Sequence, residues 1–203
     1  MMYSKLPNLV LGFHGCDLST FDSVIKDSKP MRASTNKYDW LGPGIYFWEN
    51  NYERAYDWAV AQSKNPRSKI KNPAVIGAVI DLGYCLNLTD YKSTDIIKRG
   101  YKMLELLFNG LGKPMPENKN VKGNKDLLVR YLDCAVIQQI HTFNEDTGKP
   151  AYDSVRGVFV EGDEIYPNSG FREKTHIQIC VVNPNCIKGY FDPRKPNESY
   201  PMP

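Results

Sequence analysis

Strand-like and helix-like patterns follow one another along this 203-residue chain in an order that limits its fold. Runs rich in β-branched and aromatic residues lie near both ends, and the clearest of them, residues 74–82, is typical of a central strand. Between these runs, residues 94–111 and 125–141 carry apolar side chains at the three- and four-residue spacing of amphipathic helices. Strands, then two helices, then strands again predict an α+β fold rather than alternating β–α–β units.

The chain length fits a single domain. We assign residues 1–192 to that domain, with a helical insertion at about 93–142, and we expect a flexible tail at 193–203, which is polar and rich in proline. No stretch approaches the roughly 18 consecutive apolar residues that span a bilayer. Residues 1–7 lack the apolar core of a signal peptide. We therefore expect a cytoplasmic protein that makes no membrane contact.

The cysteines and the charge exclude some classes of protein. There are five cysteines, an odd number, and no Cys-x-x-Cys pair. This pattern argues against a disulfide framework and against a cysteine-built zinc site, so we expect reduced thiols and no metal. The formal net charge of +3 permits an acidic ligand or a nucleic acid and argues for neither.

Three segments carry residue types that suggest chemistry. His14 and Gly15 end the first apolar run, and residues 42–47 have the sequence Gly-Pro-Gly-Ile-Tyr-Phe. A late strand, residues 175–182, follows an acidic loop. In this order and separation the segments resemble the ADP-ribosyltransferase superfamily, in its diphtheria-toxin and PARP-like branch. That branch is marked by a His, a Tyr and a third residue, usually Glu, on a late strand.

The resemblance implies split, twisted antiparallel β-sheets flanked by helices, and NAD⁺ as co-substrate. His14 would hydrogen-bond the adenosine-side ribose, and Gly15 would offer its backbone N–H and C=O to the nicotinamide carboxamide. Tyr46 would stack on the nicotinamide ring, and Gly44 would allow a close approach. The leaving group is already cationic, so the site has to position NAD⁺ and stabilise an oxocarbenium-like ribosyl cation.

The third family position falls on Gln178, with His176 two residues earlier on the same strand face. His176 is a candidate contact of the NAD⁺ ribose and equally a candidate structural histidine. A neutral amide stabilises a cation less than a carboxylate does, which argues against poly(ADP-ribose) chain growth without excluding single transfers. A carboxylate of the preceding loop, Glu161, Glu164 or Glu173, would then supply the base for the acceptor, and Glu164 is our candidate.

Each of these residues also has a structural interpretation. His14 alone on an apolar strand would be assigned to the core, and so would Tyr46. Gln178 alone would be a half-buried strand residue. Their occurrence together, in the order of the family motifs, favours a shared site over three separate packing roles.

The sequence thus predicts an NAD⁺-dependent mono-ADP-ribosyltransferase that attaches ADP-ribose to a macromolecule, either a protein or a nucleic acid. By resemblance alone we expect a toxin or anti-phage effector that has a neutralising partner protein. Two alternatives stay open: an NAD⁺ glycohydrolase, with water as the acceptor, and a catalytically weak module that binds NAD⁺ or ADP-ribose. The RNA 2′-phosphotransferase branch is disfavoured, because we find no matching set of Arg and His residues to hold its phosphate.

Overall fold

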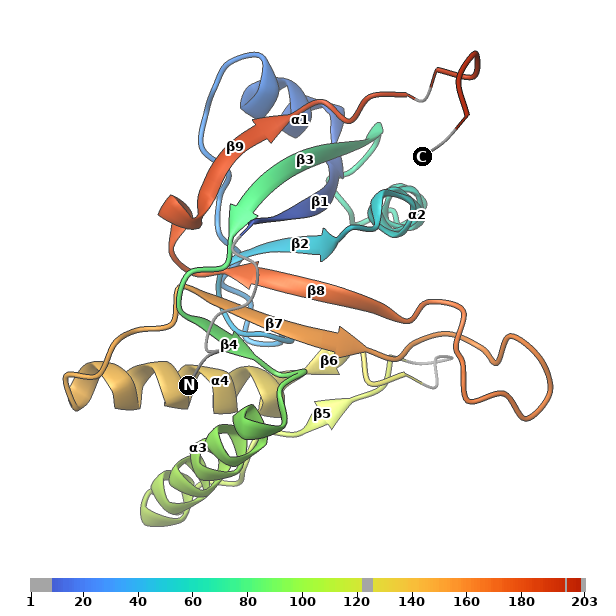
Figure 1. Cartoon of the computed structure of the whole chain (residues 1–203). Coiled ribbons are helices and arrows are strands. Elements are labelled where there is room, and N and C mark those ends of the chain that lie inside the picture. Colours follow the sequence, from blue (N-terminus) through green and yellow to red (C-terminus); the bar gives the residue numbers. More distant parts are fainter. Residues whose placement is uncertain (1–8, 122–125, 196, 202–203) are drawn as a thin grey trace.

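A seven-stranded sheet runs through the molecule in the order β4-β7-β8-β2-β1-β3-β9 (Figure 1). The computed structural model describes residues 9–121, 126–195 and 197–201. The strands of the sheet are β1 (Leu9–Asp17), β2 (Ile45–Glu49), β3 (Pro73–Asp81), β4 (Cys85–Asn87), β7 (Ser154–Phe159), β8 (His176–Val181) and β9 (Ile187–Phe191). The helices are α1 (Leu18–Ile25), α2 (Tyr52–Ser63), α3 (Tyr91–Gly110) and α4 (Tyr131–Asp146), which confirms the predicted α+β class.

The sheet departs from the expected antiparallel arrangement at one edge. Neighbouring strands are antiparallel except β4 and β7, which are parallel. Residues 82–84 join β3 to β4 without a reversal of the chain, so β4 continues in the direction of β3 and reaches the far edge of the sheet. The sheet is therefore mixed.

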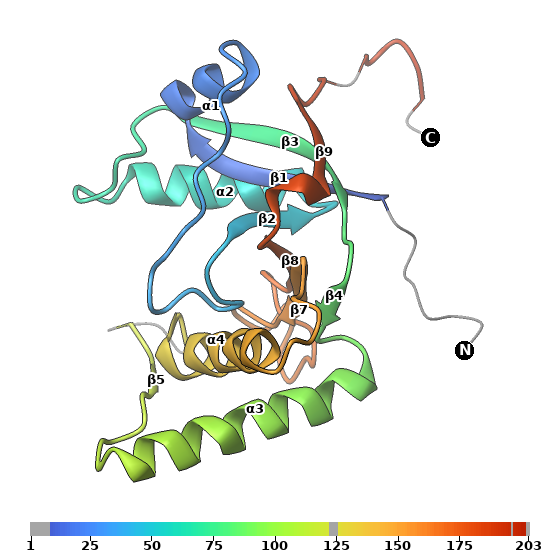
Figure 2. The same ribbon diagram turned by 90° about the vertical axis from the view of Figure 1, so that its left-hand side faces the viewer.

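The helices lie at two ends of the sheet. Figures 1 and 2 show α1 and α2 beside β1 and β3, while α3 and α4 run together beneath β4 and β7. A two-stranded sheet of β5 (Asn118–Lys119) and β6 (Val129–Arg130) lies near the start of α4, and the short helix η1 (Pro184–Cys186) precedes β9. The helical segment that we predicted as an insertion thus occupies one end of the molecule.

Side chains alternate between the two faces of the sheet, and we name the face that α2 and α4 cover the α2–α4 face. Trp48 of β2 packs there in one cluster with Ala55 of α2. Val155 of β7 packs there with Ile137 of α4. The opposite face has its own core, in which Phe47 is fully buried. Residues 46 and 48 of β2 therefore face the space between α2 and α4.

Local sequence explains where α2 begins. The sequence favours Asn50 or Asn51 as the cap of this helix. Asn51 is the one used, and its side chain accepts a hydrogen bond from the backbone N–H of Arg54 (3.0 Å). Ala55 and Ala59, four residues apart, are fully buried against the sheet. Their small side chains let the helix approach β1 closely, which fixes the position of Arg54 beside the sheet.

The helix α4 begins at Tyr131, several residues later than the sequence pattern predicts. The side-chain oxygen of Asn118 accepts hydrogen bonds from the backbone N–H groups of Leu132 (2.9 Å) and Asp133 (3.2 Å). These are among the first amides of the helix, which lack partners within the helix itself. A residue of β5, distant in sequence, therefore sets the start of α4.

Within the described residues, no helix is long and apolar enough to cross a membrane. Residues 1–7, in which we found no signal-peptide pattern, lie outside the described part, and so do residues 196 and 202–203 of the predicted tail.

Candidate active site

The three segments that carry the predicted site residues are neighbours in the sheet, in the order β8-β2-β1. Trp48 of β2 lies opposite Gln178 of β8 and opposite Phe13 of β1. Segments far apart in the sequence therefore meet at the centre of the sheet.

The strands β1 and β2 pair over a short distance only. Their register ends at Phe13 and Trp48, although β1 remains paired with β3 and β2 with β8 well beyond that point. We call the place between residues 14–17 of β1 and residues 45–47 of β2 the β1–β2 opening. Backbone groups that point into it cannot be satisfied by the β1–β2 ladder.

The backbone N–H and C=O of Gly15 point into this opening. Asn50 N–H donates to Leu11 O (2.9 Å) on the β2 side of β1, and Leu18 N–H donates to Asn72 O (2.8 Å) on the β3 side. The polar groups of a strand point alternately to either side from one residue to the next, so those of Gly15 point toward β2. In the described part of the chain they have no strand partner there.

His14 bridges the opening with its side chain. Its Nδ1 lies 2.7 Å from the backbone O of Tyr46. A carbonyl oxygen can only accept, so Nδ1 carries the proton and donates it. Burial lowers the pKa of His14, against the effect of this hydrogen bond, which favours a neutral ring. The neutral ring then leaves Nε2 as an acceptor, for which no partner occurs among the described residues.

Tyr46 lies on the other face of the sheet from His14. Phe13 and Trp48 share the α2–α4 face, and alternation puts Tyr46 there too, whereas His14 contacts Phe47 on the opposite face (ring centroids 5.9 Å apart). The two predicted residues therefore meet through the Tyr46 main chain and not through their rings.

The Tyr46 hydroxyl holds a turn in place. It donates to Gly42 O (2.7 Å) and accepts from Leu41 N–H (2.8 Å). Burial raises the pKa of the phenol far above its usual value, so it stays protonated. The hydroxyl thus has a structural task, and the half-buried ring is the part of Tyr46 that is left for a ligand.

Gly15 and Gly44 are required by packing. A Cβ atom at Gly15 would lie 2.2 Å from the backbone O of Ala55 in α2, and one at Gly44 would lie 2.4 Å from Cys180 Sγ. Both distances are far below van der Waals contact, so only glycine fits. The close approach of α2 at Gly15 also leaves that residue buried.

Gln178 lies half-buried on the α2–α4 face between two neighbours of different size. Trp48 is its partner on one side and Gly157 on the other. No hydrogen bond of its side-chain amide occurs among the described residues. The amide is therefore available to a ligand.

His176 belongs to a buried polar group that we call the His176 cluster, formed by His176, Glu161, Arg54 and Trp48. Arg54 Nη2 donates to Glu161 Oε2 (3.0 Å), and the His176 Nδ1 lies 3.7 Å from the same oxygen and 2.6 Å from Lys174 O. The rings of Trp48, Phe159 and Trp40 surround the imidazole, with centroids 5.7–6.5 Å away.

Protonation in the cluster follows from burial. Burial lowers the pKa of His176 to about 4, with the Arg54 charge acting in the same direction, so the ring is neutral near pH 7. Burial raises the pKa of Glu161, and the contact with Arg54 opposes that rise. The cluster thus contains a neutral imidazole and a carboxyl group whose affinity for a proton is increased.

Three buried atoms of the cluster have no hydrogen-bond partner in the described part of the chain: Trp48 Nε1, Arg54 Nε and His176 Nε2. Two of them are donors, and the neutral His176 ring makes the third an acceptor, since Nδ1 donates to Lys174 O. Leaving such a buried group unsatisfied costs about 1–3 kcal/mol. Unsatisfied groups that gather at one place indicate a site for a polar ligand or ordered water.

The other two loop carboxylates lie outside the cluster. Glu164 forms an ion pair with Arg172 (3.5 Å) and accepts a hydrogen bond from Asn168 N–H (2.9 Å), so it braces the loop 160–175. Glu173 is exposed. Of the three candidate bases, Glu161 is the one that the fold brings to His176.

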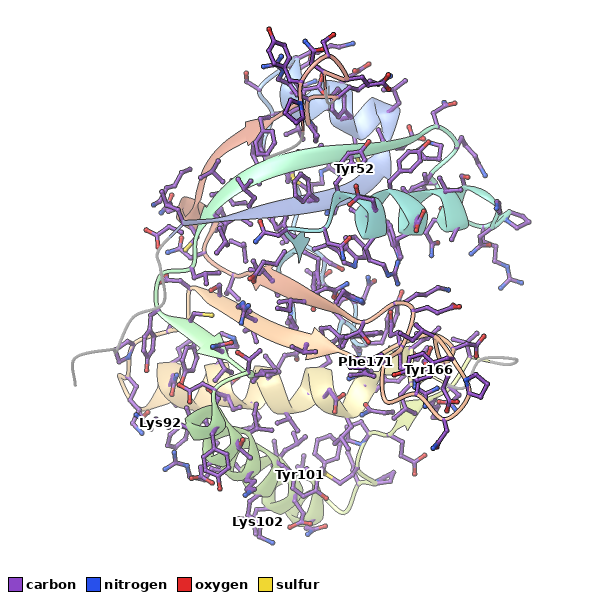
Figure 3. The ribbon with its side chains drawn as sticks, turned by 45° about the vertical axis from the view of Figure 1, so that its right-hand side comes forward. Tyr52, Lys92, Tyr101, Lys102, Tyr166 and Phe171 are labelled. Atoms are coloured by element: carbon purple, nitrogen blue, oxygen red, sulfur yellow. The ribbon has the colours of Figure 1, made fainter. Side chains whose placement is uncertain are left out.

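Loop 160–175 also presents two large aromatic side chains to solvent. Tyr166 is 54% exposed and Phe171 is 67% exposed. Figure 3 shows both on this loop, on the side of the molecule where β7 ends and β8 begins. The loop that we predicted before the late strand therefore presents an exposed apolar surface.

Arg54 and Trp48 are site residues that were not predicted from the sequence. Arg54 lies in the first turn of α2, where the helix macrodipole disfavours a cation, and this placement was a signal for a specific anionic partner. Trp48 is two residues after Tyr46 on the same strand, so period-two alternation was enough to put both on one face.

Two cavities among the described residues lie beside these groups. One, of about 670 Å³, lies between α3, α4 and β7 and shares Trp40 and Phe159 with the surroundings of His176. The other, of about 380 Å³, is lined by Phe13, Tyr52 and Phe191 together with basic residues of the segment after β9. His14, Tyr46 and Gln178 line neither of them, so the site that we derive rests on hydrogen bonding and not on cavity size.

Comparison with known proteins finds a distant relative. The chain is 26% identical over 193 residues to the uncharacterized protein MJ0359 of Methanocaldococcus jannaschii, covering 87% of this chain and 83% of that protein. No protein-family model matches the chain, and no solved structure matches it significantly.

Proposed function

We propose that this protein is a mono-ADP-ribosyltransferase that uses NAD⁺ and transfers ADP-ribose to a macromolecule. The observation that carries the proposal is the β1–β2 opening. Gly15 points a free N–H and C=O into it, and beside it His14 has a fixed tautomer with a free acceptor nitrogen among the described residues. A carboxamide has a complementary donor and acceptor, and a ribose hydroxyl can donate to Nε2. These are the contacts that the resemblance implies.

One bond of NAD⁺ has to break during the transfer, and its cleavage requires no acid catalyst. The bond between the nicotinamide nitrogen and ribose C1′ breaks, and its electron pair neutralises the nicotinamide charge. A nucleophile of the acceptor forms the new bond to C1′ and gives its proton to a base. The protein has to position both partners and stabilise positive charge on the ribose.

We assign the base to Glu161 in place of Glu164. Burial raises the pKa of Glu161, which brings its affinity for a proton closer to what a general base needs near neutral pH. Gln178 lies on the same face as a neutral hydrogen-bonding group. A neutral third residue fits single transfers better than chain growth.

A macromolecular acceptor fits the exposed end of loop 160–175. Tyr166 and Phe171 present exposed apolar rings on this loop, which joins Glu161 to His176 along the chain. Exposed aromatic groups of this kind are typical of surfaces that contact other macromolecules. Water as the acceptor would need no such surface.

The test is transfer of labelled ADP-ribose. The protein is incubated with NAD⁺ labelled in its adenylate part and with a cell lysate, and samples are then treated with protease or nuclease. We expect label on macromolecules, and the treatment that releases it identifies the acceptor class. His14→Ala should abolish transfer, whereas His141→Ala, which changes a histidine on α4 that packs against Tyr152, should keep it.

Other results would replace the proposal. Release of nicotinamide with free ADP-ribose as the sole product would make the protein a glycohydrolase. Binding of NAD⁺ without release of nicotinamide would make it a binding module, with Gln178 as the reason. Equal loss of transfer in the His14 and His141 variants would show that transfer does not depend specifically on the β1–β2 opening.

A further inference from the structure

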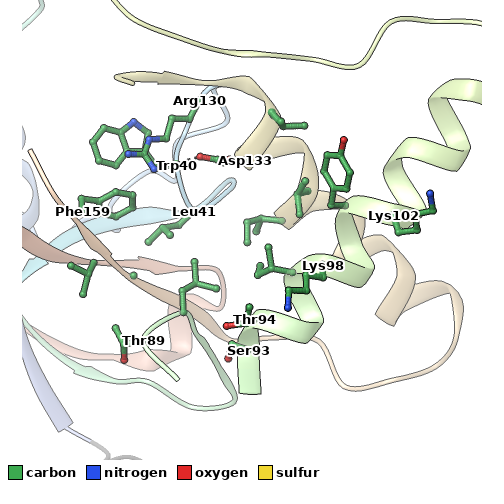
Figure 4. A pocket seen from close by; sticks show the side chains of 18 residues that line it. Trp40, Leu41, Thr89, Ser93, Thr94, Lys98, Lys102, Arg130, Asp133 and Phe159 are labelled. Atoms are coloured by element: carbon green, nitrogen blue, oxygen red, sulfur yellow. Dashed lines mark hydrogen bonds and ion pairs between the residues drawn. The ribbon is translucent and has the colours of Figure 1, made fainter. Parts of the chain in front are cut away.

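The cavity of about 670 Å³ is a built pocket at the end of the molecule that the family resemblance does not cover. Its walls come from α3, α4, the residues that directly follow β4, and the outer edge of β7. Apolar side chains form the floor: Leu41, Leu88, Ile97, Val136 and Ile137. Figure 4 shows the space that these elements enclose, with Trp40 and Phe159 at one end and α3 at the other. The volume and apolar lining are those of a small-molecule site.

One backbone residue points its hydrogen-bonding groups into this pocket. Val182 N–H donates to Asp153 O on the β8 side of β7, and Leu88 N–H donates to Arg156 O on the β4 side. By alternation, the N–H and C=O of Val158 point to the β4 side. The β4 register stops at Arg156, so in the described part of the chain these groups have no strand partner.

The Val158 side chain does not explain its place in the pocket lining. Val155 and Phe159 pack toward α4, so alternation turns the Val158 side chain to the opposite face, where it is 47% exposed. Val158 therefore lines the pocket with its backbone. A ligand there meets one donor and one acceptor side by side on an otherwise apolar floor.

The rim of the pocket is cationic. Lys98 and Lys102 lie one turn apart on α3, and Arg130 lies over the Trp40 ring with Cζ 4.2 Å from its centroid. Asp133, paired with Arg130, is the one acid among the described lining residues. In Figure 4 the two lysines and Arg130 stand on opposite sides of the space. Lys98 and Lys102 also have acidic neighbours on α3, Asp95 and Glu105. These helix-surface ion pairs are weak, so an anionic group at the mouth of the pocket can attract the lysines from one side and Arg130 from the other.

We propose that this pocket binds an adenine mononucleotide. The Hoogsteen edge of adenine presents the N7 acceptor next to the N6 amino donor, which matches the N–H and C=O of a single residue, whereas the same edge of guanine presents two acceptors, N7 and O6. The flat base fits the apolar floor, and the phosphate fits the cationic rim. The site is separate from the β1–β2 opening, and the proposal does not rest on the proposed function.

The test is isothermal titration calorimetry with four probes. AMP should bind at least tenfold more tightly than GMP, than adenosine, which lacks the phosphate, and than ribose 5-phosphate, which lacks the base. Equal affinity for AMP and either partial compound, or for AMP and GMP, would overturn the proposal. Failure of AMP to bind at about 1 mM, the weak limit of useful affinities, would overturn it too.

Backbone recognition can be tested directly with Val158→Pro. Proline removes the N–H but no ladder hydrogen bond, because that N–H faces the open edge, where proline is tolerated. We expect AMP affinity to fall at least tenfold. Val158→Thr, which keeps the N–H, should bind as the parent protein does. Circular dichroism and thermal melting show whether both variants are folded, and equal AMP binding by the folded Pro and Thr variants would contradict the proposal.

Two further variants locate the bound nucleotide. Lys98→Glu combined with Lys102→Glu should weaken AMP binding at least tenfold, since both rim charges reverse. His14→Ala should leave AMP binding unchanged. Loss of AMP binding in His14→Ala alone would place the nucleotide at the β1–β2 opening and would refute a second site, whatever the outcome of the transfer assay.

Discussion

The β1–β2 opening and the cavity between α3, α4 and β7 present similar backbone groups in different surroundings. At each place the pairing of two strands ends, and the next residue along the strand that faces the missing partner points its backbone N–H and C=O into the gap. This residue is Gly15 in β1 and Val158 in β7. Near Gly15 the titratable groups are buried, and three atoms of the His176 cluster have no partner among the described residues. Around Val158 the cations lie at a rim, and each has an acidic neighbour. Buried groups without partners are suited to chemistry, whereas apolar walls with a charged rim are suited to recognition.

The largest expected effect is on stability, and it separates the buried ion pair of Arg54 and Glu161 from an exposed ion pair at the pocket rim. The side chains of Arg54 and Glu161 are 17% and 6% exposed, whereas those of Lys98 and Asp95 are 71% and 72% exposed. Arg54→Leu leaves a buried carboxylate alone and should lower the free energy of unfolding by about 3–5 kcal/mol. Lys98→Leu should change it by less than about 0.5 kcal/mol. Urea unfolding at pH 7 measures both, and similar values for the two variants would show that the buried ion pair contributes no more to stability than the exposed one.

The next effect is a pH dependence that belongs to the His176 cluster. An unfolded histidine takes up a proton below about pH 6.5, whereas folded His176 stays neutral down to about pH 4. Between these values the unfolded state binds more protons, so stability falls as the pH falls, by up to about 3 kcal/mol.

His176→Gln isolates this contribution, because His14, His141 and Glu161, whose pKa values are also shifted, remain in the variant. The difference in unfolding free energy between the parent protein and the variant should shrink from pH 6.5 to pH 4. Parallel curves over that window would show that His176 is not held neutral.

A smaller effect on stability is expected for two glycines, Gly15 at the β1–β2 opening and Gly157 beside Val158 in the pocket. A Cβ at Gly15 would meet the backbone of α2, whereas one at Gly157 would lie 3.2 Å from a Leu41 methyl group that can move. Gly15→Ala should destabilise the protein by about 1–3 kcal/mol or more, and Gly157→Ala by less than about 1 kcal/mol. Thermal melting of both variants tests this order, and the reverse order would mean that α2 can yield at the opening.

The smallest effect is expected for Glu164→Gln. Its ion pair with Arg172 is well exposed, at 40% and 36% for the two side chains, so the stability should change by less than about 0.5 kcal/mol. Transfer of ADP-ribose should stay within about twofold of the parent, whereas Glu161→Gln should lose at least a factor of about 10². A larger loss of transfer in the Glu164 variant would restore Glu164 as the base that the sequence pattern favours.

Elements with strong local patterns were predictable from the sequence. The run at 74–82 became β3, and Ala55 and Ala59, whose four-residue spacing predicts a shared helix face, are both buried in α2. Asn51 was one of two predicted caps and is the one used. In these cases the deciding contacts lie within a few residues of each other, so periodicity and capping rules contain the answer.

Features that depend on distant residues were not predictable. The sequence pattern favours Ser19 or Thr20 as the cap of α1. Asp17 caps it instead, because its carboxylate also accepts hydrogen bonds from the backbone of Lys71 and Asn72. The start of α4 is set by Asn118 in the same way. At the candidate site, the assembly of the His176 cluster needs the pairing of β2 with β8 and the approach of α2, neither of which leaves a local pattern.

The position of β8 has a consequence for synthesis on the ribosome. Tyr46 of β2 pairs with Cys180 of β8, so the centre of the sheet is missing until nearly the whole chain has been translated. At roughly 5–20 residues per second, β8 leaves the ribosome roughly ten seconds after β2. A nascent chain that stops after α4 has His14 and Tyr46 but neither Glu161 nor His176. The His176 cluster therefore assembles only after the last quarter of the chain has been made.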